Sequence, residues 1–286
     1  MTGRRVSWTL LAVLVLAQIC YPLTTGATRA GLTVATVVLG WLLSVGHALL
    51  SRGLRAASAL VAVATGGGFA IEAVGVATGV PFGSYDYSGE LGPKLAGVPL
   101  IIPLAWTWMA WPAWLAAVRL TAGSGSPTAG TGSPAGRWAG RVALAALGLA
   151  AWDLFLDPQM VSEGYWVWRD ASPALPGLPG IPVSNYLGWL LFAVLLMSAL
   201  RPLAGPSAEH TDQRDHPMIA LYLWTYGSSI LAHAVFLGLP ASALWGAAGM
   251  SVTAVPLAVT LLRARRARDP HRDDRHRHRT GVDATR

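Results

Sequence analysis

The chain has 286 residues, of which 53% are hydrophobic and only 12% charged, and its mean hydropathy is +0.47. Soluble domains carry about 25% charged residues, so this composition excludes an ordinary soluble enzyme and indicates an integral membrane protein. The net charge of +7 does not indicate a nucleic-acid partner, because the arginines gather at the ends of apolar segments and in the C-terminal tail. The 13 tryptophans are expected at the headgroup interface, where Trp is favoured.

Eight apolar segments follow one another along the chain. Backbone in lipid must satisfy its own hydrogen bonds, so each segment is predicted to be a membrane-spanning helix. They cover residues 6–25, 30–50, 56–80, 95–118, 138–157, 185–200, 218–238 and 240–262. The first segment follows two arginines, as the apolar part of a signal peptide would, but its roughly 20 residues are long enough to span. We therefore expect it to be retained.

The basic residues provide a test of this assignment, because cytoplasmic loops are enriched in Lys and Arg. With eight helices, 18 of the 21 Lys and Arg residues fall on one side of the membrane and three on the other. This bias predicts an all-α, polytopic membrane helix bundle of about eight transmembrane helices with both termini cytoplasmic. We expect a multi-pass protein of the cell membrane.

The predicted helices divide into two groups of four. Residues 1–120 contain helices one to four with an external loop at 81–94, and residues 138–262 contain helices five to eight. Between them, residues 121–137 are rich in Gly, Ser, Thr and Pro, which is typical of a flexible linker. Residues 263–286 form a basic cytoplasmic tail, which we expect to be a disordered topology anchor, with anionic-lipid binding as the alternative.

Two loops on the non-cytoplasmic side share an order of features. The first, within "GVPFGSYDYSGELGPKLAGVP", carries Tyr85 and Tyr87, and the second carries Trp166 and Trp168. Each loop follows a helix of the same direction and closes with a Gly-apolar-Pro triplet. We predict that the loops form two halves of one cap. Their aromatic side chains are candidates for substrate binding, and an ordinary interfacial aromatic belt is the alternative.

Glu72 lies inside the apolar stretch "GGGFAIEAVGVATG". An ionisable side chain in a spanning helix costs about 2.5–3.5 kcal/mol on insertion scales, so its presence needs an explanation. The glycines that precede it allow a neighbouring helix to approach closely. Glu72 is either a protonated group that bonds another helix or a buried functional acid, and we favour the functional reading.

Asp153 and Asp157 lie four residues apart in "WDLFLDP", which places both carboxyl groups on one helical face. Two adjacent carboxyl groups tend to share a proton, leaving one as an acid and one as a base. Asp157 precedes Pro158 and could simply end the helix, so we give Asp153 more weight. Asn185 begins the next helix, where it could cap the helix or position a water or an acid, as part of a substrate site.

Motifs for cofactors are missing from the sequence. It contains no phosphate-binding Gly loop, nucleotide fingerprint, Ser-His-Asp signal or cluster of metal ligands at a recognised spacing. His47 and His233 lie in apolar runs and are expected to form hydrogen bonds between helices. We therefore predict a protein that works without a cofactor or a metal.

The stretches "EAVGVATGVPFGSYDYSGELGPKLAGVPLIIPLAW" and "WDLFLDPQMVSEGYWVWRD…GIPVSNYLGW" resemble the carotenoid biosynthesis membrane-protein family, which includes the carotenoid 1′-hydratases. The resemblance covers roughly Gly66–Trp189. It implies a cofactor-independent hydro-lyase that adds water to the terminal double bond of an acyclic carotenoid. The implied partners are that carotenoid, the lipid bilayer and other carotenoid-biosynthesis enzymes.

This chemistry suits the acids found above, because protonating a trisubstituted alkene needs a dry, strong acid and gives a tertiary cation. Aromatic faces can stabilise such a cation. We assign the proton donor to Asp153 and the positioning of water to Glu72, although the reverse assignment fits nearly as well. Three other functions stay open: a lycopene-cyclase-like enzyme that closes a ring instead of capturing water, a proton-coupled membrane transporter, and a non-catalytic assembly factor.

Overall fold

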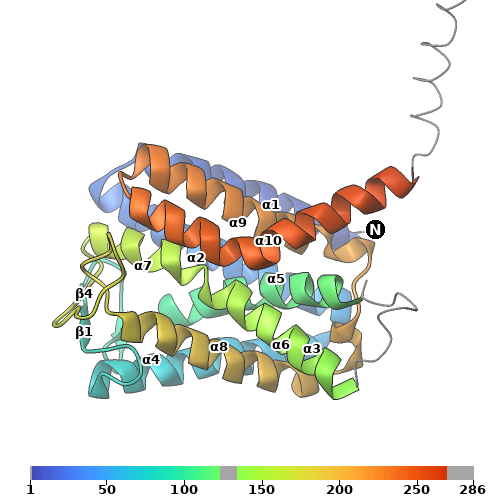
Figure 1. Ribbon diagram of the computed structural model, residues 1–286, viewed down its shortest axis with the longest axis horizontal. Helices are drawn as coiled ribbons and strands as arrows, with labels where there is room; N and C mark the ends of the chain where they lie inside the picture. Colours follow the sequence, from blue (N-terminus) through green and yellow to red (C-terminus); the bar gives the residue numbers. More distant parts are fainter. Residues whose placement is uncertain (1, 123–133, 269–286) are drawn as a thin grey trace, which may run out of the picture.

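The computed structural model describes residues 2–122 and 134–268 and places most of them in helices that run along one bundle (Figure 1). The helices are α1 (Thr2–Cys20), α2 (Gly26–Arg52), α3 (Leu54–Leu60), α4 (Gly67–Thr78), α5 (Ile102–Ala122), α6 (Pro134–Ala150), α7 (Asp153–Ser162), α8 (Val183–Ala204), α9 (His216–Leu231) and α10 (Pro240–Arg268). A π-helical turn joins α3 to α4, and another extends α9. Of the predicted linker only residues 121–122 and 134–137 are described, and they belong to α5 and α6; of the predicted tail only residues 263–268 are described, and they extend α10.

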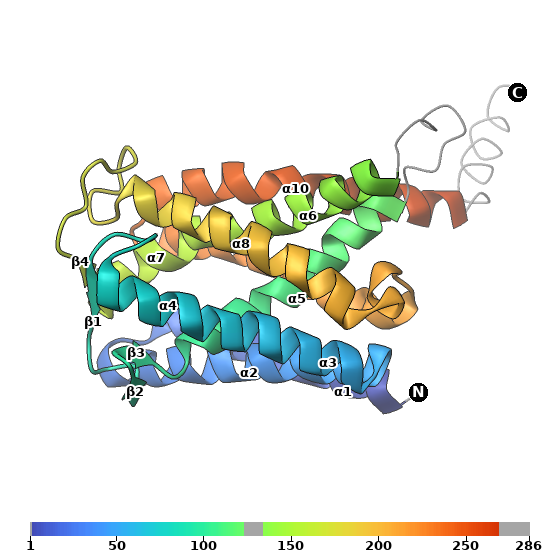
Figure 2. The ribbon, with the colours of Figure 1, turned by 90° about the horizontal axis from the view of Figure 1, so that it is seen from below.

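The all-α membrane bundle is confirmed, because seven of the described helical stretches are long and apolar enough to cross a membrane. The fourth predicted segment forms α5, a helix of 21 residues that is not among these seven. The described ends of the chain, at the start of α1 and the end of α10, lie at the same end of the bundle (Figures 1 and 2). This agrees with an even number of crossings, and the count of eight and the cytoplasmic termini stay predictions.

The predicted start of the fourth helix at residue 95 is wrong. Strands β2 (Lys94–Leu95) and β3 (Val98–Pro99) pair there as a short antiparallel hairpin. The two residues between them, Ala96 and Gly97, both have positive φ angles, 49° and 82°. Two such residues in succession are what a tight two-residue hairpin turn requires. The helix therefore begins only at Ile102.

The predicted end of the fifth helix at Asp157 is also wrong, because α7 continues through Pro158 to Ser162. Proline has no backbone N–H, so the carbonyl of Leu154, one turn earlier, loses its helical partner. The Ser242 hydroxyl of α10 donates to that carbonyl at 2.7 Å. This bond from a neighbouring helix satisfies the freed group inside the bundle.

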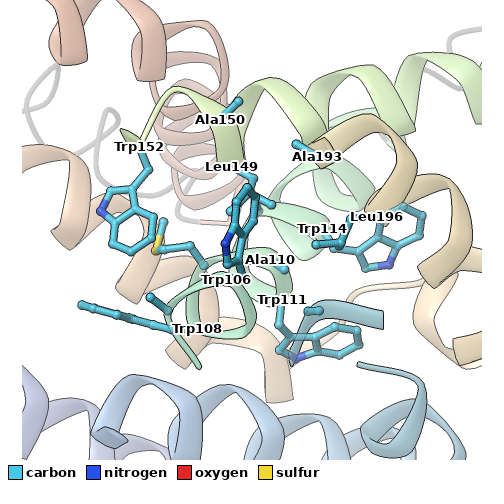
Figure 3. Close-up of a cluster of buried hydrophobic side chains, with 14 of the residues drawn as sticks. Trp106, Trp108, Ala110, Trp111, Trp114, Leu149, Ala150, Trp152, Ala193 and Leu196 are labelled. Atoms are coloured by element: carbon cyan, nitrogen blue, oxygen red, sulfur yellow. The ribbon is translucent and has the colours of Figure 1, made fainter. Parts of the chain in front are cut away.

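Helix α5 forms the centre of the bundle, and Figure 2 shows it running obliquely between α2 and α4 on one side and α6 and α10 on the other. Sixteen of its 21 residues are buried. They include four tryptophans that are labelled in Figure 3, namely Trp106, Trp108, Trp111 and Trp114. The expectation that tryptophans lie at the headgroup interface is therefore wrong for this helix.

The outer helices present apolar side chains to their surroundings instead. Leu16 of α1 is 61% exposed and Leu244 of α10 is 74% exposed. Large exposed aliphatic side chains of this kind are unfavourable in water and favourable in lipid. The chain is a multi-pass membrane protein whose tryptophan-rich central helix is covered by the others.

The two predicted loops meet at one end of the bundle, seen on the left of Figure 1. Strand β1 (Tyr85–Tyr87) pairs antiparallel with β4 (Trp166–Trp168), so that Tyr85 faces Trp168 and Tyr87 faces Trp166. Alternate residues of a strand point to opposite faces. The four aromatic rings therefore share the inner face of this two-stranded cap.

Candidate active site

A cavity of about 130 Å³ lies among the helices beneath the cap. Its wall is formed mostly by aromatic and aliphatic side chains, with polar groups at a few places. Mostly apolar pockets with a few convergent polar groups are the usual form of ligand sites. Seven of the eight candidate residues line this cavity: Glu72, Asp157, Asn185, Tyr85, Tyr87, Trp166 and Trp168.

Glu72 stands at the cavity wall as an acceptor for three neutral donors. Its Oε2 atom accepts from the hydroxyl of Tyr85 at 2.6 Å and from that of Tyr87 at 2.8 Å. Its Oε1 atom accepts from the indole N–H of Trp106 at 3.0 Å. A carboxylate offers about four acceptor positions, so these three bonds leave room for one further donor on Oε1.

Close packing of α4 against α5 makes the bond between Glu72 and Trp106 possible. A Cβ atom at Gly68 would lie 3.0 Å from the Trp106 ring, a contact tighter than side chains normally make. The glycine, one turn before Glu72, thus lets the indole reach the carboxylate. This is the role predicted for the glycines that precede the acid.

The cap holds its aromatic rings in edge and tilted contacts over Glu72. The rings of Tyr85 and Tyr87 lie 5.3 Å apart, and Tyr85 lies 5.5 Å from Trp168. Tyr87 meets Trp166 edge-on at 5.4 Å. The indole N–H of Trp168 donates to the backbone carbonyl of Phe82 at 2.9 Å, which fixes this ring. Such contacts hold the rings in place around the acid.

The cap also sets the protonation of its own ionisable side chains. Burial, followed by the neighbouring Glu72 carboxylate, raises the pKa of the Tyr85 phenol and of the Tyr87 phenol. Both hydroxyls therefore keep their protons and act as donors at neutral pH. On the outer face of the cap, a hydrogen bond from Arg169 lowers the pKa of the exposed Asp86 carboxyl.

Asp153 and Asp157 face the start of α8, where one amide holds both of them. The Nδ2 atom of Asn185 donates to Asp153 Oδ2 at 2.9 Å and also to Asp157 Oδ2. Asn185 does not cap its helix, since the cap residue is Pro182 and no side chain bonds the first turn. The two carboxyl groups also lie within hydrogen-bonding reach of each other.

The structure separates the roles that these two acids can play. Asp157 is 3% exposed and lines the cavity, whereas Asp153 is fully buried and does not line it. The other oxygen of Asp153, Oδ1, has no hydrogen-bond partner in the described part of the chain. A brief break between α6 and α7, at Ala151 and Trp152, turns the helix before Asp153. The sequence interpretation gave Asp153 more weight, but Asp157 is the acid at the cavity wall.

None of the three acids forms an ion pair with Lys, Arg or His within residues 2–122 and 134–268. Their partners are Tyr hydroxyls, an indole N–H and an Asn amide, together with the other acid of the Asp pair. Neutral donors stabilise a carboxylate without cancelling its charge. The site can therefore hold, release and accept protons beside an apolar ligand.

Sequence reasoning missed Trp106 and Trp189. Their rings stack at 3.7 Å with an angle of 17° between planes, and both line the cavity. The signal was present as a helix with Trp at 106, 108, 111 and 114, a spacing that places several indoles within the turns of one helix. The pattern is ambiguous, because Trp is common both at the headgroup level and in packed cores, and the sequence alone predicts the interfacial position.

The two histidines behave as expected from their apolar surroundings. His47 Nδ1 accepts from the Trp111 indole at 3.0 Å, and its Nε2 lies 3.0 Å from the carbonyl oxygen of Arg214. His233 contacts Ser242 of α10 at 2.8 Å and Gln159 of α7 at 3.2 Å. Both residues join helices through hydrogen bonds.

Comparison with known proteins agrees with this picture. Residues 31–262 match the model of a family described as carotenoid biosynthesis protein. Over 146 residues the chain is 36% identical to bisanhydrobacterioruberin hydratase from Haloarcula japonica, covering 50% of this chain and 44% of that protein. The match thus spans less than half of the relative's length. No solved structure matches the chain significantly. Because the family match covers most of the chain and includes every candidate site residue, this protein belongs to the carotenoid biosynthesis protein family.

Proposed function

We propose that the protein is a cofactor-independent carotenoid hydratase of the cell membrane. It adds water to the terminal carbon–carbon double bond of an acyclic carotenoid and forms a tertiary alcohol. One observation carries the proposal. Glu72 and Asp157, two acids without an ion-pair partner in the described part of the chain, line one apolar cavity together with aromatic rings. The family match and the hydratase similarity support the choice of substrate class.

The size of the cavity suits one end of a long polyene rather than the whole molecule. At about 130 Å³ it accepts an isoprenoid end group, and the rest of the chain extends toward the lipid. Aromatic and aliphatic walls bind such a group through burial of apolar surface. The reacting double bond is thereby placed beside the acids and away from bulk water.

The first chemical step is protonation of the alkene by Asp157. Two carboxyl groups that adjoin each other out of water share one proton, since both cannot be charged together. The Asn185 amide holds Asp153 and Asp157 in that arrangement. Asp157 gives its proton to the less substituted alkene carbon, and the positive charge develops on the more substituted carbon. The Asp pair then carries two negative charges only while the cation lies beside it, and the positive charge of the cation offsets them.

The second step is stabilisation of the tertiary cation by the ring faces around the cavity. The rings of Tyr85, Tyr87, Trp166 and Trp168 belong to the cap, and the stacked Trp106 and Trp189 belong to the helices. A cation near an aromatic face gains about 0.5–2 kcal/mol or more when water is excluded. This stabilisation lengthens the life of the cation until water reaches it.

The third step is capture of the cation by water. Glu72 keeps one acceptor position free on Oε1, so it can orient a water molecule and accept its proton as the carbon–oxygen bond forms. The proton then returns to the Asp pair. The cycle consumes one alkene and one water, forms one C–H and one C–O bond, and needs no redox partner.

Expression in a lycopene-producing bacterial host, with pigments analysed by mass spectrometry, tests the function. A hydratase adds the mass of one water to the pigment at each end that reacts. A cyclase leaves the mass unchanged and shifts the retention and spectrum. Unaltered pigment, with the protein inserted in the membrane, contradicts both enzyme functions and leaves transport or assembly.

The matched control for this experiment is Asp86→Asn beside Asp157→Asn. Both changes replace a carboxyl group by an amide of the same size. Asp86 lies on the outer face of the cap, where its side chain is 54% exposed, and it does not line the cavity. We expect Asp86→Asn to retain conversion and Asp157→Asn to lose it.

A further inference from the structure

One face of α9 is polar although the helix crosses the membrane. Thr225, Ser228 and Ser229 lie in α9, and His233 follows in its π-helical extension. Their spacing of three and four residues places them along one side of the helix. All four line the cavity. Hydroxyl groups on a spanning helix usually face protein or water rather than lipid.

The helices opposite this face are polar at the same level. Tyr21, in the short 3-10 turn after α1, and Thr33 and Thr36 of α2 also line the cavity. We call these three residues, together with Thr225, Ser228 and Ser229, the polar wall. It comes from the turn after α1, from α2 and from α9, whereas the acids and the cap come from α4, α7, α8 and the strands. The cavity thus has two polar regions built from different elements.

Three groups on or beside the polar wall are buried without a usable partner. The Thr225 hydroxyl and the Trp108 indole N–H make no hydrogen bond within the described part of the chain. The Tyr21 hydroxyl lies near Gln159 and Thr33 but forms no bond of normal geometry. These three residues are 2%, 5% and 7% exposed. Buried polar groups are nearly always bonded to protein or to ordered water.

Small polar ligands can satisfy groups of this kind. The indole N–H can only donate, whereas a hydroxyl donates and accepts. Water fits this mixture, since an ordered buried water makes two to four bonds to otherwise unsatisfied groups. An apolar polyene cannot bond any of them, so it does not replace water at this wall.

From this arrangement we infer that the polar wall holds the water that the proposed hydration consumes. The inference rests on the proposed function. It divides the cavity into an acid and aromatic side that forms the cation and a hydroxyl-lined side that keeps the nucleophile. Thr225 and Trp108 are positioning residues here, because they hold water and do not touch the reacting carbons.

An experiment in deuterium oxide distinguishes protonation of the alkene from capture of the cation by water. The acid delivers deuterium to the alkene in the first step. A cation that meets no water returns to an alkene by losing a proton, and the recovered pigment keeps deuterium. The ratio of deuterium in recovered pigment to hydrated product therefore reports water capture independently of the first step.

The test compares Thr225→Val with the wild type in isolated membranes supplied with lycopene in deuterium oxide. Valine keeps the shape of threonine and removes the hydroxyl. We expect hydrated product to fall by about 3–10-fold, the usual effect of one hydrogen bond, and the deuterium ratio to rise by a similar factor. Thr225→Ser, which restores a hydroxyl, should return both values toward the wild type.

Thr253→Val on α10 is the matched control. Thr253 is 1% exposed, and its hydroxyl faces the Leu144 carbonyl at 3.4 Å, away from the cavity lining. A deuterium ratio for Thr225→Val equal to that of this control, with normal wild-type hydration, overturns the inference and leaves the hydratase proposal intact. A wild type that hydrates nothing overturns the hydratase proposal, and this inference with it.

Discussion

The two ends of the bundle both bury carboxyl groups, but they surround them differently. At the end opposite the cap, fully buried Asp215 accepts from Arg52 at 2.8 Å and lies 3.6 Å from His47. Beneath the cap, Glu72 is held only by two phenols and an indole. Asp157 is held by an amide and by its neighbouring acid, Asp153.

Under the proposed function, this difference separates a structural acid from the acids that transfer protons. The guanidinium of Arg52 donates to both oxygens of Asp215 at 2.8 Å, which ties this carboxyl group into a buried ion pair. Neutral donors orient a carboxylate yet leave it able to take up and release a proton. The comparison teaches that the partner of a buried acid, rather than its depth, indicates its use.

The most direct test of this comparison is to change the acids beneath the cap. Glu72→Gln and Asp157→Asn keep size and hydrogen-bonding capacity but cannot transfer protons. We expect each to lower pigment conversion by about 10²–10⁴-fold, the range of general acid–base catalysis. Membrane insertion and thermal melting in detergent should stay near wild type. Conversion by the lycopene-producing host measures the first effect.

Asp153→Asn sharpens this prediction. Asp153 stands behind Asp157 and does not line the cavity, so its loss should reduce conversion less than the loss of Asp157. The opposite order, with Asp153→Asn the more damaging, would return the donor role to Asp153, as the sequence interpretation had it. Retained conversion in both variants would reduce the pair to a structural hydrogen-bonding group.

At the opposite end, Asp215→Asn should damage stability instead of chemistry. Removing one partner of a buried ion pair leaves the other charge uncompensated, at a cost of about 3–5 kcal/mol. Thermal melting of the purified protein should fall markedly, while each folded molecule converts pigment normally. The double change Arg52→Met with Asp215→Leu removes both charges and should recover part of the lost stability.

Tyr85→Phe should have an intermediate effect. The ring remains for the cation, but the bond from the hydroxyl to Glu72 at 2.6 Å is lost. A hydrogen bond to a charged group contributes about 1.5–3 kcal/mol, so we expect about a 10–100-fold loss of conversion. Tyr85→Ala removes the ring as well and should lose clearly more. Equal losses of conversion in the two variants would show that the ring does not stabilise the cation.

The smallest effect concerns the ion pair of Asp86 with Arg169 on the outer face of the cap. The folded-state pKa of Asp86 is lowered, so the pair contributes stability above the unfolded-state pKa of the side chain. That contribution disappears as the pH falls through the lowered folded-state value. Asp86→Asn should therefore resemble the wild type in strong acid and show at most a slight loss at neutral pH. A pH series of thermal melting checks this.

Much of the site was predictable, because an acid is rare inside an apolar helix and because two loops with matching aromatic pairs are unusual. Glu72 stood out as an acid in an apolar helix, and the Tyr and Trp pairs stood out in matching loops. The choice between Asp153 and Asp157 depended on which of the two residues of α7 lines the cavity, which no residue pattern announces. The buried position of Trp106 depended on which helix the others cover, and that is set by tertiary packing.

The helices and loops show the same contrast between features that residue patterns predict and features that tertiary packing sets. Apolar length predicted the spanning helices, because lipid forces the backbone into helices whatever the side chains. The sequence predicts helix where the β2–β3 hairpin lies, because Leu95, Val98 and Leu100 continue an apolar run. Helix α7 continues past Pro158, and Ser242, 84 residues later in the chain, supplies a donor for the carbonyl that the proline leaves free.

The central place of α5 has a consequence for how the protein is made. This helix belongs to the first half of the chain, yet α6, α9 and α10 from the second half cover part of its surface. During synthesis, part of this tryptophan-rich helix therefore stays uncovered until those later helices arrive. The two halves are therefore poor candidates for separate production, and a truncated chain ending after α5 would present its uncovered face to chaperones and membrane proteases.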